Sequence, residues 1–487
     1  MIRQSQHDYQ TVTRSRPAEA PKAAIRKPVP AFAEEPAADR IPVSRLVLDQ
    51  DGTFLKRGHV MSFGALFLFT AVLYARPAEF YPSAFTNKLA LILGLVTFGL
   101  YLISQLALEG TLTARPREVH LVLLFMLAAL LSIPLAIDSS IAWGEFSATF
   151  IRGVLIFIVI INVTRTTARL KAMLFLSVVT ALVLSGIAVN DYRLGLLTIE
   201  GYRAAGHGTG IFGNTNDMAL HLVTMLPISV ALFFGARNPL MKVIHAGCAL
   251  VMMSAILLSY SRGAFLGMLV VLVFFAFKLA PGNRVAIVLL AIVGAITVIL
   301  LAPSGYGTRL LSIFVPGLDP GGSADQRRGE LFRSAWVALR HPLLGVGMGN
   351  YQPLMSLKGL VTHNSYTQVA AEMGATALVL YTMFIVAPLR KLAAIARDSF
   401  ATRKSSDLYY LALGLQASLL AYMVSSFFLS VAYAWYVYYL VGYAVCFRRI
   451  YESETGKLIT VETRKSRRQK AGVAAPSIPD NARPAAA

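Results

Sequence analysis

The feature that most constrains this chain is the recurrence of long apolar stretches. About twelve of them approach the roughly 20 residues that an α-helix needs to cross the hydrocarbon core of a bilayer. They cover residues 59–75, 89–108, 119–137, 147–163, 170–189, 217–235, 240–258, 263–280, 285–302, 368–388, 408–427 and 429–447. Only 14% of the 487 residues are charged, whereas soluble domains carry about a quarter. The sequence therefore predicts an all-α polytopic membrane protein with about twelve transmembrane helices.

The basic residues are distributed unevenly between the predicted loops. The formal net charge is +20, a value that nucleic-acid binding could also explain. When alternate loops are assigned to opposite sides of the membrane, the side that holds both termini carries roughly three times as many Lys and Arg residues as the other. Because basic loops stay in the cytoplasm, this bias predicts two cytoplasmic termini. It also removes the need for a nucleic-acid partner.

Two polar segments flank the predicted membrane domain, which spans residues 59–447. Residues 1–58 lack the apolar core of a cleavable signal peptide, and we expect a disordered cytoplasmic extension. Residues 448–487 form a basic, disordered cytoplasmic tail, for which a topogenic role is favoured over binding to membrane lipids. Cys248 and Cys446 fall within predicted spans, so they indicate neither a disulfide nor a metal site.

Two predicted outward loops are long, at about 190–216 and 303–367. Loops of this length in a compact protein are usually functional or disordered, and neither loop has low-complexity composition. Apolar residues at helical spacing predict an amphipathic helix over about 325–340 that ends before Pro342 and lies on the outer membrane interface. No strand precedes the glycine-rich run 345–349, so it indicates a tight turn back to the bilayer rather than a nucleotide site.

The end of the large loop carries polar residues that are unusual in so apolar a chain. Ser365 and Gln368 have the spacing of a capping box, which predicts a helix that starts near Ser365 with His363 just outside it. The positive end of the helix dipole disfavours an imidazolium there. A neutral histidine at the membrane edge can act as a general base.

A polar stripe continues from this point into the predicted span. Its members recur every four residues and so share one helix face: Asn364, Gln368, Glu372 and Thr376. Polar groups in membrane helices usually face a cavity or the bundle interior. The residues alone leave two interpretations open with equal weight. Either the stripe and His363 form a reactive site, or the stripe bonds neighbouring helices and His363 is an ordinary loop residue.

Three arginines lie on the side that the positive-inside rule should deplete of them. Arg203 is in the first long loop, Arg262 lies between two spans, and Arg328 begins the predicted amphipathic helix. A planar guanidinium suits bidentate contact with phosphate oxygens, so together with a neutral histidine these side chains would suit an anionic substrate. The alternative for each is a lipid-headgroup contact or a local carboxylate pair. The outer loops contain no pair of acids at one-residue separation, so we expect no metal. We also expect no cofactor.

Four segments, in this order, resemble the O-antigen ligase and O-antigen polymerase superfamily of bacterial membrane glycosyltransferases. They are Tyr202-Arg203 with 210–216, then 260–264, then Arg328 with Trp336 and 342–347, and finally His363-Asn364 with Gly374. The resemblance covers roughly residues 59–447 and includes the large outer loop before the tenth span.

The resemblance implies transfer of a glycan from an undecaprenyl-diphosphate carrier at the periplasmic face of the inner membrane, without a metal. The acceptor would be a sugar hydroxyl on a glycan or on lipid A-core, in O-antigen or exopolysaccharide assembly alongside other assembly proteins. His363 would be the catalytic base, and Arg203 and Arg328, with Arg262, would bind the donor diphosphate. The stripe residues Asn364, Gln368 and Glu372 are further substrate-binding candidates.

Two choices stay open at this stage. Ala377 departs from the residues that ligases often place three positions after the glycine matched by Gly374, and ligase and polymerase remain alternatives. A transporter or flippase of lipid-linked glycans is the alternative from another class. It predicts inverted repeats and interrupted helices, and the sequence shows no clear internal repeat.

Overall fold

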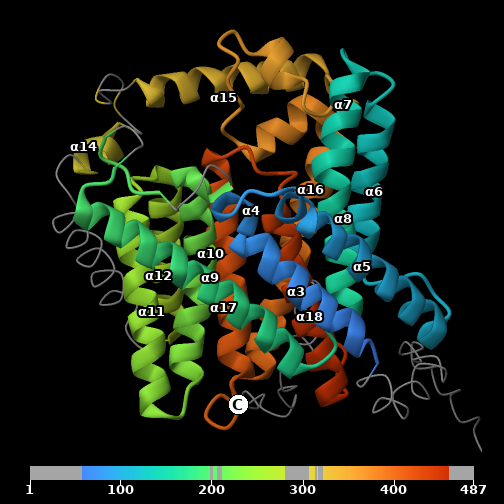
Figure 1. The fold of residues 1–487 in the computed structure, drawn as a ribbon, viewed down its shortest axis with the longest axis vertical. Coiled ribbons are helices and arrows are strands. Elements are labelled where there is room, and N and C mark those ends of the chain that lie inside the picture. Colours follow the sequence, from blue (N-terminus) through green and yellow to red (C-terminus); the bar gives the residue numbers. More distant parts are fainter. Residues whose placement is uncertain are drawn as a thin grey trace, which may run out of the picture. The chain divides into compact units, whose positions relative to one another are not determined.

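The computed structural model describes residues 58–459, except for 198–200, 206–210, 280–305, 313–314, 316–317 and 319–321. Within these ranges the chain forms helices and no β-strand (Figure 1). The longer helices are α3 (Val60–Ala75), α5 (Ala84–Glu109), α6 (Arg117–Ser132), α8 (Ile151–Val163), α9 (Thr167–Leu194), α10 (Thr215–Gly235), α11 (Pro239–Leu258), α12 (Arg262–Leu279), α15 (Ser323–Arg340), α16 (Ser365–Asp398), α17 (Leu408–Ser425) and α18 (Trp435–Thr455). The shorter ones are α4 (Pro77–Phe80), α7 (Ser139–Glu145), η1 (Phe146–Phe150), η2 (Ile211–Gly213), α14 (Tyr306–Leu311), η3 (Tyr351–Met355) and η4 (Ser426–Phe428).

Nine helical stretches in the described ranges are long and apolar enough to cross a membrane. They correspond to nine of the predicted spans, so the prediction of a helical membrane protein is confirmed. The predicted span 119–137 is α6, which has only 16 residues. The span 429–447 overlaps α18, in which tyrosines and an arginine pair reduce the apolar character. The span 285–302 lies outside the described residues, so the count of twelve is not established.

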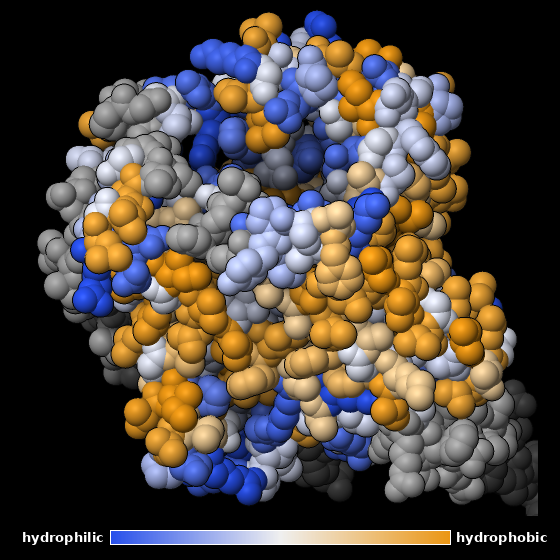
Figure 2. Space-filling model, viewed as in Figure 1, coloured by the Kyte–Doolittle hydropathy of each residue, from blue (hydrophilic) through white to orange (hydrophobic). Residues whose placement is uncertain are grey.

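Large apolar side chains are exposed along the middle of the bundle. On α5, Leu95 and Ile103 are 64% and 70% exposed, and Leu250 on α11 is 63% exposed. Figure 2 shows these surroundings as an apolar belt between two hydrophilic ends. Exposed apolar surface on this scale is unfavourable in water, whereas it matches the hydrocarbon core of a bilayer.

α10 and α17 lie at the centre of the bundle and pack directly on each other. Gly414 of α17 allows the close approach, because a Cβ there would lie 2.7 Å from the Cβ of Ala231. α16 packs on α17, α6 and α18, and α18 also packs on α8. The start of α16 is thereby fixed from several sides.

α16 is interrupted at Gly374, although the sequence predicts one continuous span there. Gly374 has φ 83° and ψ 178°, which is not helical. The loop 342–347 fills the break: the Ala375 amide donates to the Pro342 carbonyl at 2.7 Å. In return the amides of Val346 and Gly347 donate to the carbonyls of Ala371 and Glu372, both at 2.9 Å. The backbone groups that the break would leave unpaired are therefore satisfied by the loop.

Glycine is required on both sides of this contact. A Cβ on Gly374 would lie 2.3 Å from the Leu343 carbonyl oxygen, and one on Gly345 would lie 2.3 Å from the Glu372 carbonyl carbon. Both glycines also have positive φ, which L side chains rarely adopt. The glycine-rich run is thus a docking segment for α16. The prediction of a simple turn back to the bilayer missed this contact.

α15 confirms the helix predicted within the large loop, and it ends at Arg340 before His341-Pro342. Its apolar stripe faces away from the bundle, with Phe332, Trp336 and Leu339 55–74% exposed. The opposite face buries the polar side chains Glu330 and Ser334. This stripe is compatible with the outer membrane interface, and that location stays a prediction.

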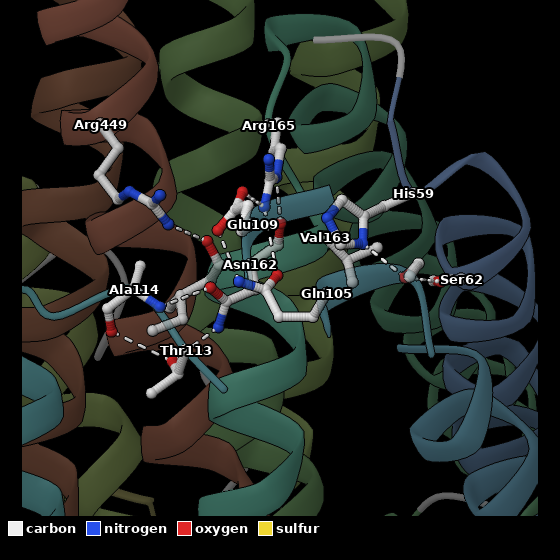
Figure 3. Close-up of polar contacts among 12 residues, drawn as sticks. His59, Ser62, Gln105, Glu109, Thr113, Ala114, Asn162, Val163, Arg165 and Arg449 are labelled. Atoms are coloured by element: carbon white, nitrogen blue, oxygen red, sulfur yellow. Dashed lines mark hydrogen bonds and ion pairs between the residues drawn. The ribbon is translucent and has the colours of Figure 1, made fainter. Parts of the chain in front are cut away.

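A polar cluster occupies the end of the bundle opposite α15 (Figure 3). Arg165 pairs with Glu109 and donates to the Gln105 side chain at 3.3 Å. Arg449 donates to the Ile161 carbonyl. Further basic residues gather at the helix ends here, among them Arg169, Lys171, Lys278, Arg390 and Arg403. These residues lie in or next to loops that the sequence analysis assigned to the cytoplasmic side, and that assignment stays a prediction.

His59 belongs to the same cluster, and its Nδ1 lies 2.7 Å from the Ser104 hydroxyl. Burial, together with the Arg165 cation, lowers the pKa of His59 to about 4. Between pH 6.5 and 4 the unfolded chain binds a proton that folded His59 excludes, so stability should fall as pH falls through this range.

We expect the variant His59→Gln to lose less stability over this pH range than the parent protein. The difference between about 4 and 6.5 corresponds to about 3 kcal/mol at most. Thermal unfolding in detergent at several pH values measures it. Equal pH slopes for the two proteins would contradict the assignment. Other buried histidines remain in both proteins and cancel in the comparison.

Candidate functional site

His363 lies at the start of α16 in a left-handed conformation with φ 51°. Non-glycine residues rarely adopt this region. The next residue, Asn364, caps the helix by accepting from the Tyr366 and Thr367 amides, both at 2.9 Å. The helix begins at Ser365 as predicted, but the predicted capping box was wrong. Asparagine is as good a cap as serine, and the Ser365 hydroxyl instead donates to the Leu429 carbonyl at 2.7 Å.

The linker 426–434 between α17 and α18 holds this corner. The Asn364 side-chain amide donates to the Phe427 carbonyl at 3.0 Å. The Thr362 and Ser430 hydroxyls lie 2.7 Å apart, and the Gln368 side-chain oxygen accepts from the Ala432 amide at 3.4 Å. Asn364 and Gln368 therefore have structural partners, as the second interpretation of the stripe expects, and they position the backbone that carries His363.

Glu372 is buried one turn deeper in α16, with 3% exposure. Its carboxylate accepts from the Tyr433 hydroxyl at 2.7 Å and from the Tyr351 amide at 3.4 Å. It thus joins the linker 426–434 to η3, next to the break at Gly374. The sequence offered no signal for Tyr433 or Tyr351, because both contacts join segments far apart in the chain.

Burial and the neighbouring Arg327 cation lower the pKa of His363 to about 4. The imidazole is therefore neutral at pH 7 and can accept a proton. The neutral state agrees with the sequence-based expectation, but its main cause is burial, with a cation second, rather than the helix dipole. The same observation places the charge of Arg327 near His363.

Arg328 points to a different partner. Its guanidinium lies 3.8 Å from the Asp325 carboxylate, one turn earlier on α15, and both side chains are about a third to a half exposed. The sequence analysis named Arg328 as a candidate for binding the donor diphosphate, and the structure adds Arg327 as the arginine that lowers the pKa of His363. Periodicity alone could not separate adjacent positions on this helix.

α15 is fixed over the start of α16 by buried polar contacts. The Ser334 hydroxyl donates to the Thr367 hydroxyl at 2.9 Å. Glu330, 5% exposed, accepts from the Tyr351 and Ser356 hydroxyls at 2.7 and 3.0 Å. α15, which carries Arg327, is therefore held in a defined position over the start of α16.

Arg203 is buried, with 4% exposure. Its Nε donates to the Ser259 carbonyl at 2.9 Å, and Nη2 donates to the Asn216 side chain at 3.0 Å. The Ala204 amide also donates to the Leu258 carbonyl at 3.0 Å. The first long loop is thereby attached to the end of α11 and to the start of α10.

Arg262 is the first residue of α12 and is 5% exposed. The next residue, Gly263, packs on Phe428, and a Cβ on Gly263 would lie 2.8 Å from the Phe428 side chain. The Gly263 carbonyl accepts from the Ser425 hydroxyl at 3.1 Å. The adjacent Phe427 carbonyl binds Asn364. The starts of α12 and α16 therefore contact the same turn after α17, and Arg203 reaches this end through Ser259.

The helices α10, α12 and α16 all begin at this end of the bundle (Figure 1). The positive dipole ends of these helices favour anions. Figure 2 shows the surface hollowed beneath α15, with hydrophilic residues in the recess. No group of three metal-ligating His, Cys, Asp or Glu side chains occurs in the described part of the chain.

These features define a polytopic membrane protein with a basic, histidine-containing site at the helix N-termini of one end. Residues 247–382 match the family model of the O-antigen ligase family. The match confirms the predicted resemblance to the O-antigen ligase and polymerase superfamily of membrane glycosyltransferases. The matched region contains Arg262, Arg328, His363 and Gly374, whereas Arg203 lies before it. No curated protein matches the chain.

Proposed function

We propose that this protein transfers a glycan from an undecaprenyl-diphosphate-linked donor to a sugar hydroxyl on a glycan or lipid A-core acceptor. The reaction takes place at the periplasmic face of the bacterial inner membrane, in O-antigen or exopolysaccharide assembly. The observation that carries the proposal is a neutral, half-buried His363 beside an arginine. His363 and Arg262 lie within the region that matches the O-antigen ligase family, and Arg203 lies at the same end of the bundle.

In the proposed reaction, the neutral imidazole of His363 accepts the proton of the acceptor hydroxyl. The oxygen attacks the anomeric carbon of the donor, and the bond from that carbon to the diphosphate oxygen breaks. Arg203, Arg262, Arg327 and Arg328 would stabilise the departing diphosphate, where negative charge grows. Because one displacement occurs, the anomeric configuration inverts.

The distribution of charge supports the orientation. The basic helix ends around Arg165 and Arg449 lie opposite the site. By the positive-inside rule that end is expected to face the cytoplasm, which supports our proposal that His363 faces the periplasm and that both termini are cytoplasmic.

The break in α16 is the one observation that favours the alternative, a flippase or transporter of lipid-linked glycans, because transporters bind substrate at interrupted helices. In such sites the freed backbone groups face a cavity. Here the groups around Gly374 bond to the loop 342–347 instead. This use of the break favours a structural joint and hence the enzyme.

Deletion of the gene, followed by analysis of surface and carrier-linked glycans, tests the proposal. Loss of a ligase leaves full-length polymer on the lipid carrier, and loss of a polymerase leaves single repeat units. Retention of the lipid-linked glycan in the cytoplasmic leaflet would instead identify a flippase. Unchanged glycans would contradict the proposal. Transfer by the purified protein in proteoliposomes, with donor and acceptor alone, would establish the activity directly.

A further inference from the structure

A cavity of about 570 Å³ opens between α3, α5 and the η1–α8 segment. This volume is typical of sites that hold a small ligand or part of a larger one. Most of its walls are apolar, with Phe69 of α3, Leu91 and Phe98 of α5 and Ile156 of α8 among them. Leu95 of α5, one of the exposed apolar side chains of the belt, also lines the cavity, so the cavity adjoins the surface that matches the hydrocarbon layer.

One charged side chain lines this cavity. Arg152 lies inside the candidate membrane span Ser139–Val163 and is exposed to the cavity. Within the described residues no carboxylate lies within ion-pair distance of it. An ionisable side chain in a membrane helix is costly and usually marks a functional site. A guanidinium in this setting suits an anionic phosphate group.

The cavity extends along α5. Asn87, in the first turn of α5, and Trp435, the first residue of α18, lie toward the end that carries His363. Phe98 lies 11 residues beyond Asn87, or about 16 Å along the helix, toward the opposite end. The Trp435 indole nitrogen is buried and has no hydrogen-bond partner among the described residues. The end toward His363 therefore offers the Asn87 amide and the Trp435 indole donor, while the walls are mostly apolar along the cavity, a combination that suits an amphiphile.

The polar end adjoins the candidate site. Trp435 packs edge-on against Phe212, at 6.3 Å between ring centroids. Phe212 lies shortly before Asn216, which accepts a hydrogen bond from Arg203. Two residues before Trp435, Tyr433 donates to Glu372. Trp435, in one wall of the cavity, is thus connected with the candidate site in two ways: it packs on the segment before Asn216, and it follows shortly after Tyr433 in the chain.

We propose that this cavity binds a polyprenyl phosphate lipid. The apolar walls hold the isoprene units next to the headgroup, the rest of the chain extends into the bilayer, and Arg152 contacts the phosphate nearest the chain. The inference rests on the proposed function, because this lipid carries the donor glycan. It adds a chain-binding site and a fixed direction of approach, from the α3–α5 side.

Binding to the purified full-length protein tests the inference, with undecaprenyl diphosphate, inorganic diphosphate and phosphatidylglycerol as probes. Ala90→Phe fills the cavity from α5 and should weaken binding of undecaprenyl diphosphate by about tenfold, because excluding two methylene groups from an apolar site has this effect. It should leave inorganic diphosphate binding unchanged. Ile92→Phe, on the same helix but outside the cavity lining, is the matched control. Arg152→Gln should weaken binding of undecaprenyl diphosphate and of inorganic diphosphate. Arg152→Lys should keep part of the affinity that Arg152→Gln loses.

Each outcome decides a separate point. Equal weakening by Ala90→Phe and Ile92→Phe, or none by either, would overturn the cavity assignment. Phosphatidylglycerol that competes as well as undecaprenyl diphosphate would show a general lipid groove and overturn the ligand class. If the lipid binds as expected but no glycan is transferred, the proposed function fails and the binding site stands. If transfer proceeds and Ala90→Phe leaves the KM for the donor unchanged, the inference fails and the proposed function stands.

Discussion

Replacing His363 with alanine is expected to slow glycan transfer by about a hundred- to ten-thousand-fold, because a positioned general base contributes rate factors of this size. The protein should still fold, since the contacts that hold this corner come from Thr362, Asn364 and Ser365. Transfer in proteoliposomes measures the effect. The matched control is His341→Ala, an exposed histidine at the end of α15. A rate that stays normal in the His363 variant would exclude this residue as the base.

The pH dependence of transfer gives a second test of the same assignment. Because the pKa of His363 is lowered to about 4, its base function should persist at pH 6 and disappear only near pH 4. Arg327→Ala removes a cation that disfavours the imidazolium, so the acid limb should move up toward 6.5, whereas Arg327→Lys should keep it in place. If the rate fell at the same acidic pH in both variants as in the parent protein, Arg327 would not act on His363.

Gly374→Ala is expected to destabilise the protein by about 3 kcal/mol or more, since it combines a backbone clash with a conformation that alanine avoids. The new Cβ would lie 2.3 Å from the Leu343 carbonyl oxygen, and the loop 342–347 would have to leave the break. Gly345→Ala should have a similar effect from the other side. Folded yield and thermal unfolding in detergent measure both variants.

Gly329→Ala is the control for these substitutions. Gly329 lies in α15 with open space around its Cβ position, and alanine there should stabilise the helix by about 0.5–1 kcal/mol. If Gly374→Ala unfolded at the same temperature as Gly329→Ala, the docking of the loop into α16 would be wrong.

Local patterns in the sequence were enough to predict much of the fold. Apolar stretches of sufficient length located the membrane helices. Insertion of a helix into lipid depends on the apolar composition of its own residues and not on contacts with distant segments of the chain. The spacing of Leu331 and Trp336, together with Pro342, located α15 and its end. The start of α16 at Ser365 followed from the polar residues that precede it.

Contacts between distant segments could not be predicted in this way. Either Asn364 or Ser365 could have capped α16, and the linker 426–434 decides by engaging Ser365 through Leu429. The break at Gly374 depends on the loop 342–347, about thirty residues earlier in the chain. Nothing local distinguishes Arg327 from Arg328, because only the placement of α15 over α16 determines which cation lies near His363.

The joint at Gly374 also sets the size of the unit that relatives could exchange. Residues 342–347 and 371–375 complete each other's backbone hydrogen bonds. A chimera that takes only the large loop from another protein would therefore combine a loop and a break in α16 that come from different sequences. A graft that runs from the start of α15 at Ser323 through Ala375 would keep both halves, with His363 between them. The large loop and the first part of α16 would then be exchanged as one cassette of about fifty residues.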